Sequence, residues 1–336
     1  MDKHKVKKSK ITGIGFHVPE HVVTNQDLSA FMDTSDEWIQ TRTGIQERRW
    51  VSRDEAVSDL AIPAAKKAMA EANVFPKDID LVIVATLSSD YFFPGVSSQL
   101  QDKLGLRTVG AFDIKAACSA FVYGISIADQ YLRSGTCHTA LVVGAEAQTK
   151  FINKTTKGRD MAVLFGDGAG AAILQVSNNE SGILSTHLHC EGKNLNKLWM
   201  EGPGSSSPDQ INAMTNEQAK TYEPLMNGQE VFKNAVVRFP EVIQEALDYN
   251  NLSIKDVSLI IPHQANLRII QSIAKRLNLG LDKMYINIQR YGNTTAASIP
   301  IAICEALAEG KICKGDLIIL AAFGAGYTWA SAAIRW

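Results

Sequence analysis

The sequence predicts an α/β protein whose sheets are covered by helices on both faces. Short apolar segments without alternating polar positions, typical of buried strands, alternate along the chain with segments of helical periodicity. Apolar residues make up 46% of the 336 residues and charged residues 21%, which is the composition of an ordinary globular protein. Alternating strands and helices of this kind build layered sheets.

The elements follow from short apolar runs, which predict strands, and from helical spacing of apolar residues. In the first half, strands are predicted at 9–16, 80–86, 109–113, 140–145, 162–165 and 169–176, and helices at 56–72, 95–104 and 118–134. The order then restarts, with an apolar segment at 182–189, helices at 228–249 and 265–278, and strands at 257–261, 284–288, 316–321 and 328–335. The turn-forming residues of 202–208 predict a surface loop.

Two pairs of segments are similar at nearly the same offset, which indicates an internal duplication. The apolar segment 80–86 is similar to 258–264, and 141–144 is similar to 317–320. We therefore expect two related halves. They are residues 1–180 and 181–336.

The charge and cysteine content exclude several classes of protein. The 34 Lys and Arg residues balance 35 Asp and Glu residues, so general nucleic-acid binding is not expected. The 5 cysteines are scattered without a Cys-x-x-Cys pair, which indicates neither a disulfide framework nor a zinc site and fits a reducing cytoplasm. The uncharged segment 317–334 is interrupted by Gly324 and Gly326, so it predicts short buried strands rather than a membrane-spanning helix.

Cys118 is the first candidate for chemistry, because it lies between a predicted strand and a predicted helix. The unpaired N–H groups and the positive dipole end at a helix N-terminus favour a thiolate and lower its pKa. Many buried cysteines are simply small core residues, so the segment alone leaves both interpretations open. The remaining cysteines lack a comparable context.

His263 and Asn293 also lie at boundaries between elements. His263 follows an apolar strand and precedes a helix, and the carboxyl end of a strand is the functional edge of an α/β sheet. Asn293 stands in a Gly-containing turn ahead of an apolar helix. Each residue alone is also consistent with a structural role, His263 as a hydrogen-bonded core residue and Asn293 as a helix cap.

Together the three residues predict acyl transfer through a thioester, followed by carbon–carbon bond formation. A cysteine nucleophile forms the thioester, and fixed donors stabilise the negative charge that decarboxylation of a malonyl thioester leaves on its oxygen. Backbone N–H groups near the Gly-containing segment 323–326 would add further donors. One such donor is worth roughly 10²–10³ in rate.

At these residues the chain resembles beta-ketoacyl-acyl-carrier-protein synthase III, a condensing enzyme of the thiolase superfamily. The resemblance runs nearly end to end and rests on segments 33–39, 41–45, 117–119, 165–170, 263–270, 292–294 and 323–326. It implies a thiolase-like duplicated fold of five α-β-α-β-α layers. It also implies a homodimer that initiates fatty-acid synthesis, with no metal or other cofactor.

The resemblance implies a role for each catalytic group. Cys118 would take the acyl primer from acyl-coenzyme A, while His263 and Asn293 hold the malonyl thioester of acyl carrier protein during decarboxylation. The backbone N–H groups of Cys118 and Ala325 would form the oxyanion hole, although Ala325 stands where the family usually has Gly. The reaction would then be a decarboxylating Claisen condensation.

Further residues match substrate contacts of the family. Trp38 and Arg159 match residues that flank the adenine of coenzyme A, Arg42 matches a phosphate contact, and Gly228 and Asn266 match pantetheine contacts. Phe93 matches a residue that reaches across the dimer to cap an acyl pocket. The bulky residues of 89–96 leave the length of the primer open.

A basic stripe on the predicted helix 265–278 matches the family's docking patch for the acidic carrier protein. With one residue of the preceding helix, the patch consists of Lys233, Arg268, Lys275 and Arg276. Solvated helix charges explain any single one of them equally well.

Two other functions are consistent with these residues. A related condensing enzyme or acyltransferase of secondary metabolism or biotin supply would use the same residues with a different acyl donor. A non-catalytic pairing subunit would lack the nucleophile, and the intact Cys118, His263 and Asn293 argue against it.

Overall fold

The computed structural model describes residues 8–177, 181–202, 204–206 and 223–336. The loop expected at 202–208 falls only partly within them, since 203, 207 and 208 lie outside the described residues. Within the described part of the chain, no helix combines the length and the apolar character that crossing a bilayer requires.

Two central sheets carry most of the strands. The first has five strands in the order β1-β7-β6-β4-β5, with bounds Lys8–His17, Gly168–Ser177, Thr139–Glu146, Leu81–Ala85 and Gly110–Ile114. The second has four strands in the order β11-β12-β13-β8, with bounds Leu259–Pro262, Leu317–Gly324, Thr328–Arg335 and Gly182–Cys190. The uncharged segment near the C-terminus thus forms the two strands β12 and β13, as its glycines predicted.

The two sheets repeat one topology, which explains the similar segments in the sequence. In the first sheet β4 pairs parallel with β6, and β6 and β1 pair antiparallel with β7. In the second sheet β11 pairs parallel with β12, and β12 and β8 pair antiparallel with β13. The similar segments 80–86 and 258–264 become the equivalent strands β4 and β11, and 141–144 and 317–320 lie in β6 and β12. The division at residue 180 stays a prediction.

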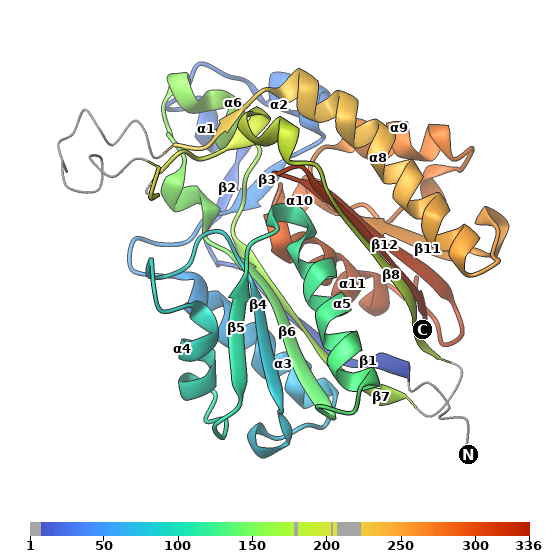
Figure 1. Cartoon of the computed structure of the whole chain (residues 1–336). Helices are drawn as coiled ribbons and strands as arrows, with labels where there is room; N and C mark the ends of the chain where they lie inside the picture. The colour runs from blue at the N-terminus through green and yellow to red at the C-terminus, as the bar shows by residue number, and fades with distance from the viewer. Residues whose placement is uncertain (1–7, 178–180, 203, 207–222) are drawn as a thin grey trace, which may run out of the picture.

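Five layers result from the way helices cover the sheets. The helices α5 (Ala120–Arg133) and α11 (Ser298–Ala308) lie between the two sheets (Figure 1) and share one apolar core with both of them. The helices α3 (Val57–Glu71) and α4 (Val96–Lys103) cover the outer face of the first sheet. The helices α8 (Gly228–Tyr249) and α9 (Leu267–Arg276) cover the outer face of the second. The predicted five-layer α/β fold is confirmed.

A smaller apolar cluster beside the sheets is formed by short elements that the sequence pattern did not reveal. They are α1 (Asn25–Ser29), α2 (Asp36–Thr43), α6 (Arg159–Ala162), α10 (Ile288–Tyr291), β2 (Val22–Thr24) and β3 (Glu47–Arg49). A further short pair, β9 (Leu198–Trp199) and β10 (Leu225–Met226), is antiparallel. Elements of two to eight residues are too short to show a period.

Two predicted strands are wrong. Residues 162–165 end the short helix α6, and only Phe165 makes a bridge, to Asn293. Residues 284–288 make a single bridge between Met284 and Ile260 before α10 begins. In both places the residues are apolar because they are buried, and burial alone does not distinguish a strand from a short turn of helix.

Candidate active site

Cys118 lies in a 3-10 turn, Ala117–Ser119, between β5 and the N-terminus of α5. The turn begins with a left-handed residue, Ala117, with a φ of 47°. Only 8% of Cys118 is exposed, so its sulfur lies in the protein interior beside the first N–H groups of a helix. The position between strand and helix is the one that the sequence predicted.

The pKa of Cys118 differs from the expected one. Burial, and next the negative charge of Glu146, raise the pKa of the Cys118 thiol to about 12. Loss of hydration therefore outweighs the favourable helix N-terminus, which acts in the opposite direction. Burial thus acts against the lowered pKa that the helix N-terminus favours.

His263 follows the last residue of β11, and its N–H continues the parallel ladder by donating to the carbonyl oxygen of Ala321 at 2.8 Å. The ring is 1% exposed, and burial lowers its pKa to about 3, so the imidazole is neutral. Its Nδ1 lies 2.6 Å from Oγ of Ser298. Its Nε2 is buried and has no hydrogen-bond partner in the described part of the chain.

Asn293 lies between α10 and a second 3-10 turn, Thr295–Ala297, that leads into α11. Its backbone is held on both sides, because its N–H donates to Leu164 at 2.8 Å and its carbonyl oxygen accepts from the Gly166 N–H at 3.1 Å. Its side-chain Oδ1 accepts the N–H of Thr295 at 2.9 Å. This bond fixes the carboxamide so that Nδ2 is its outward donor.

Contacts between these segments bring the three residues into one buried region. The turn that contains Cys118 contacts both the turn Thr295–Ala297 and β12. His263 is joined to the same place through Ser298, the first residue of α11. The segments that carry Cys118, His263 and Asn293, which are distant in the sequence, thus meet in this region.

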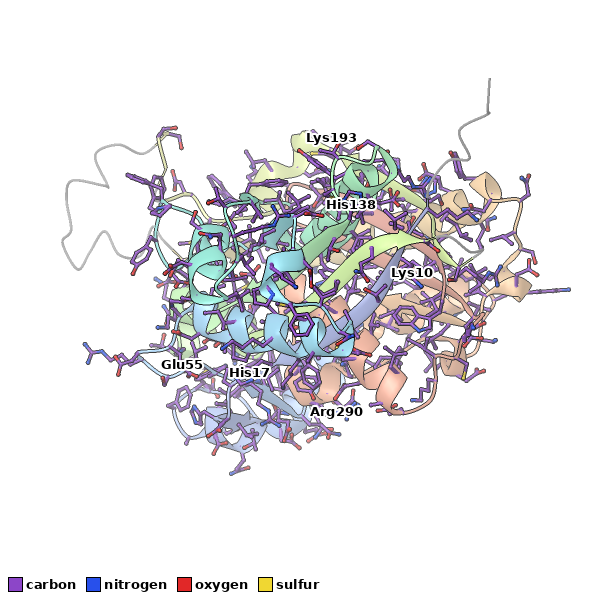
Figure 2. The ribbon with its side chains drawn as sticks, turned by 90° about the horizontal axis from the view of Figure 1, so that it is seen from below. Lys10, His17, Glu55, His138, Lys193 and Arg290 are labelled. Atoms are coloured by element: carbon purple, nitrogen blue, oxygen red, sulfur yellow. The ribbon has the colours of Figure 1, made fainter. Side chains whose placement is uncertain are left out.

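Gln264 and Glu305 connect the segments of His263 and Asn293. The carboxamide of Gln264 donates to the carbonyl oxygens of Pro262 and Tyr285, at 2.8 and 3.1 Å, and accepts from the Asn287 N–H at 3.1 Å. Glu305 of α11 accepts hydrogen bonds from three groups just before Asn293. They are Asn287 Nδ2 at 2.8 Å, Tyr291 Oη at 2.6 Å, and Arg290, whose guanidinium lies 2.8 Å away beside α11 (Figure 2).

A groove of about 970 Å³ contains all five residues predicted to bind coenzyme A. They are Trp38, Arg42, Arg159, Gly228 and Asn266. The Trp38 ring lies 4.4 Å from the Arg42 guanidinium carbon and 4.7 Å from that of Arg159. A planar aromatic ring with two cations beside it is suited to an aromatic base with attached phosphates.

Structural bonds occupy part of this groove. Asn266 caps α9 by accepting the N–H of Arg268 at 2.8 Å, and its Nδ2 donates to the carbonyl oxygen of Arg42 at 2.9 Å. Gly228 is the first residue of α8, whose N-terminus is capped by Asn227. These two residues therefore shape the groove whether or not they also contact a ligand.

Of the predicted cap and docking residues, Arg268 lines this groove, whereas Phe93, Lys233, Lys275 and Arg276 do not. Phe93 is 79% exposed and stands beside Phe92 and Tyr91, which are also exposed, in the loop between β4 and α4. Of the basic patch, Arg268 borders the groove, Lys275 and Arg276 form the last turn of α9, and Lys233 pairs with Glu230 at 2.9 Å.

Sequence reasoning missed Ser298 and Glu146. Glu146 is fully buried at the end of β6, where it accepts hydrogen bonds from Ser88 Oγ at 2.5 Å and the Leu87 N–H at 3.1 Å. Burial raises the pKa of Glu146 to about 8. A carboxylate directly after the apolar run 140–145 was a visible signal, whereas Ser298 becomes identifiable only once His263 is placed against it.

Comparisons with known proteins agree with this arrangement. The family model described as 3-Oxoacyl-[acyl-carrier-protein (ACP)] synthase III matches residues 112–192, and the model of its C-terminal part matches residues 247–336. The chain is 43% identical to the beta-ketoacyl-[acyl-carrier-protein] synthase III of Rhodospirillum centenum over 98% of its length and 99% of the relative's. The chain belongs to the beta-ketoacyl-acyl-carrier-protein synthase III family. As a member it is an acyl-transferring condensing enzyme of the type used in fatty-acid biosynthesis.

Solved structures place this synthase III within the thiolase-like fold. The 3-oxoacyl-[acyl-carrier-protein] synthase III of Aquifex aeolicus has a TM-score of 0.90 and 43% identity, covering 98% of this chain and 100% of that one. The priming beta-ketosynthase of the R1128 polyketide pathway has a TM-score of 0.91 and 31% identity, covering 100% and 98%. The predicted family and fold are both confirmed.

Proposed function

We propose that this synthase III condenses an acyl-coenzyme A primer with malonyl-acyl carrier protein through an acyl-Cys118 intermediate. The buried Nε2 of His263, which has no partner in the described residues, carries the proposal. An unsatisfied polar atom in a dry interior is costly, so its retention points to a ligand that completes it. On this basis the proposed N-terminal half, residues 1–180, supplies the thiol and the C-terminal half supplies the imidazole and carboxamide.

In the first half-reaction the Cys118 sulfur attacks the thioester carbon of acyl-coenzyme A. The attack requires the thiol proton to move to an acceptor, and the buried Nε2 of His263, which has no partner in the described residues, would take it as the carbon–sulfur bond forms. The N–H groups of Cys118 and Ala325 would hold the oxyanion. Coenzyme A leaves as a thiol with the transferred proton, and the acyl group stays on sulfur.

In the second half-reaction His263 Nε2–H and Asn293 Nδ2–H donate to the malonyl thioester oxygen. Carbon dioxide leaves, and the resulting carbanion attacks the acyl-Cys118 carbonyl and releases Cys118 as a thiolate, which takes up one proton from water to become a thiol again. The Ser298 hydroxyl can either donate to or accept from His263 Nδ1, so both tautomers of the ring are satisfied. The same imidazole can thus accept a proton in one half-reaction and donate a hydrogen bond in the other.

The groove around Trp38 would bind coenzyme A, with its adenine beside Trp38 and Arg159 and its phosphates near Arg42. The exposed ends of α8 and α9, with Lys233, Arg268, Lys275 and Arg276, would dock the acidic carrier protein. Neither role requires a metal or redox cofactor.

A homodimer would explain the exposed aromatic loop. The strand β5 is an edge strand of the first sheet, and the loop with Phe93 lies between its neighbour β4 and α4. Covering the edge with a second copy removes unpaired backbone groups from water and lets Phe93 reach the other acyl pocket. The 5 cysteines are free, which supports a reducing cytoplasm as its location.

Incubation with acetyl-, isobutyryl- and octanoyl-coenzyme A, followed by intact-mass measurement, tests the acyl-enzyme step. We expect one acyl group on wild-type protein and none on Cys118→Ala. Subsequent addition of malonyl-acyl carrier protein should release a 3-oxoacyl product. The structural similarity to a priming beta-ketosynthase favours a polyketide primer donor as the second candidate, and the same donor panel distinguishes the two.

A further inference from the structure

Two buried hydroxyl groups join the turn that carries Cys118 to the turn between β12 and β13. Ser119 Oγ donates to the carbonyl oxygen of Thr328 at 3.1 Å, across 209 positions of sequence. Thr328 Oγ1 lies 3.0 Å from the carbonyl oxygen of Ala116 and 3.1 Å from that of Ala325. The Ser119 side chain thus bonds to the backbone of the segment that carries Thr328, and the Thr328 side chain bonds to the backbone of the segment that carries Ser119.

The burial of both groups makes these bonds strong. Ser119 is 0% exposed and Thr328 is 8% exposed, so water competes little for the carbonyl oxygens. Without the hydroxyls, buried carbonyl groups would lose partners. The cross-link is thus a permanent part of the site and not a surface contact.

The joined segments touch at the proposed nucleophile. A Cβ atom added to Gly324 would lie 2.8 Å from the Cys118 nitrogen and 3.1 Å from its Sγ, so the end of β12 runs directly against Cys118. A small shift of one turn against the other would change the space above the sulfur. Hydrogen bonds that tie the turns together therefore control that space.

Each bonded carbonyl group belongs to a peptide plane next to a proposed oxyanion donor. The Ala116 carbonyl precedes Ala117, whose φ of 47° sets the direction of the Cys118 N–H. The second carbonyl group belongs to Ala325 itself, whose own N–H is the second proposed donor. A left-handed alanine is strained, so its geometry persists only where surrounding bonds enforce it.

We propose that Ser119 and Thr328 form a hydroxyl clasp that fixes the two oxyanion N–H groups relative to each other. This inference rests on the proposed function and names two positioning residues for its acyl-transfer step. The hydrogen bonds of these two hydroxyls involve neither His263 nor Asn293, so the clasp acts on the oxyanion of acyl transfer more than on malonyl decarboxylation.

The test compares Thr328→Val with Thr328→Ser, which keeps the hydroxyl, and with Ser119→Ala. The buried Ser331 provides a matched control, because its hydroxyl bonds Val242 at 2.8 Å from the same strand β13. For each variant, the acylation rate with acetyl-, isobutyryl- and octanoyl-coenzyme A is measured by rapid quench and intact mass. The decarboxylation rate of malonyl-acyl carrier protein and the melting temperature are measured in parallel.

We expect Thr328→Val to slow acylation about tenfold and Ser119→Ala by a similar factor, while decarboxylation falls much less. Thr328→Ser should restore most of the acylation rate, and Ser331→Ala should lower stability without changing the ratio of the two rates. An unchanged ratio in Thr328→Val would overturn the clasp while leaving the proposed function intact. Absence of acylation of wild-type protein by every donor would instead overturn the proposed function and the clasp with it.

Discussion

Ala117 and Thr295 have the same left-handed backbone at equivalent places in the two halves of the fold. Their φ angles are 47° and 50°, and each opens a three-residue turn directly before a central helix, α5 or α11. The two turns contact each other between the sheets. The duplication therefore places two helix N-termini together, with Cys118 in one turn and Asn293 just ahead of the other.

Removal of the Cys118 sulfur should abolish acyl transfer. Cys118→Ala should show no acyl adduct by intact mass, because no other group at the turn is a comparable nucleophile. Cys190→Ala, which changes an exposed cysteine, should acylate like the wild type. Full condensing activity in Cys118→Ala would refute the covalent mechanism.

Asn293→Ala should separate the two half-reactions. The variant should still accept an acyl group on Cys118, but its malonyl decarboxylation should slow by roughly 10²–10³, the loss expected for one oxyanion donor. Acylation is followed by intact mass and decarboxylation by release of carbon dioxide. Normal turnover would remove Asn293 from the proposed mechanism.

Stability should fall on the acid side because His263 is buried as a neutral ring. The unfolded chain binds a proton at His263 below a pKa of 6.5, whereas burial holds the folded pKa near 3. Each pH unit between these values costs up to about 1.4 kcal/mol of unfolding free energy. Urea unfolding at several pH values should show that the unfolding free energy falls less steeply below pH 6.5 in His263→Gln than in the wild type. An identical pH dependence would contradict the assignment of a neutral buried ring.

Glu146 should act in the opposite direction, between its unfolded pKa of 4.5 and its folded pKa of about 8. Its folded pKa of about 8 exceeds the ordinary 4.5, so the unfolded carboxyl loses its proton first and stability falls as pH rises through this range. Glu146→Gln cannot titrate, and its unfolding free energy should depend less on pH in the same window. Equal slopes for the wild type and the variant would show that the carboxyl stays ionised in the fold.

Reversal of charge at the end of α9 should weaken carrier-protein docking. Lys275→Glu combined with Arg276→Glu should raise the KM for malonyl-acyl carrier protein about tenfold, with little effect on acylation by acyl-coenzyme A. Lys311→Glu reverses an exposed charge elsewhere and serves as the control. A KM that stays the same in the double variant would place docking on another surface.

The sequence predicted the long elements well because burial imposes a strong pattern on them. The helix predicted at 228–249 coincides with α8, and the strand at 328–335 coincides with β13. The strands predicted at 162–165 and 284–288 were wrong because these apolar segments are too short to show a period. Cys118, His263 and Asn293 were identifiable because each stands at a boundary between elements, where side chains can reach a site.

The sequence by itself determined the family, the layered α/β order and the residues proposed to supply the chemistry, since these depend on residue types and spacing along the chain. Only the tertiary structure decided their electrostatic state and their mutual placement. Burial raises the pKa of the Cys118 thiol and lowers that of His263, and burial depends on what the rest of the chain packs around them. The partners Ser298 and Thr328 likewise became evident only in space, because residues distant in sequence have no spacing rule that predicts their contact.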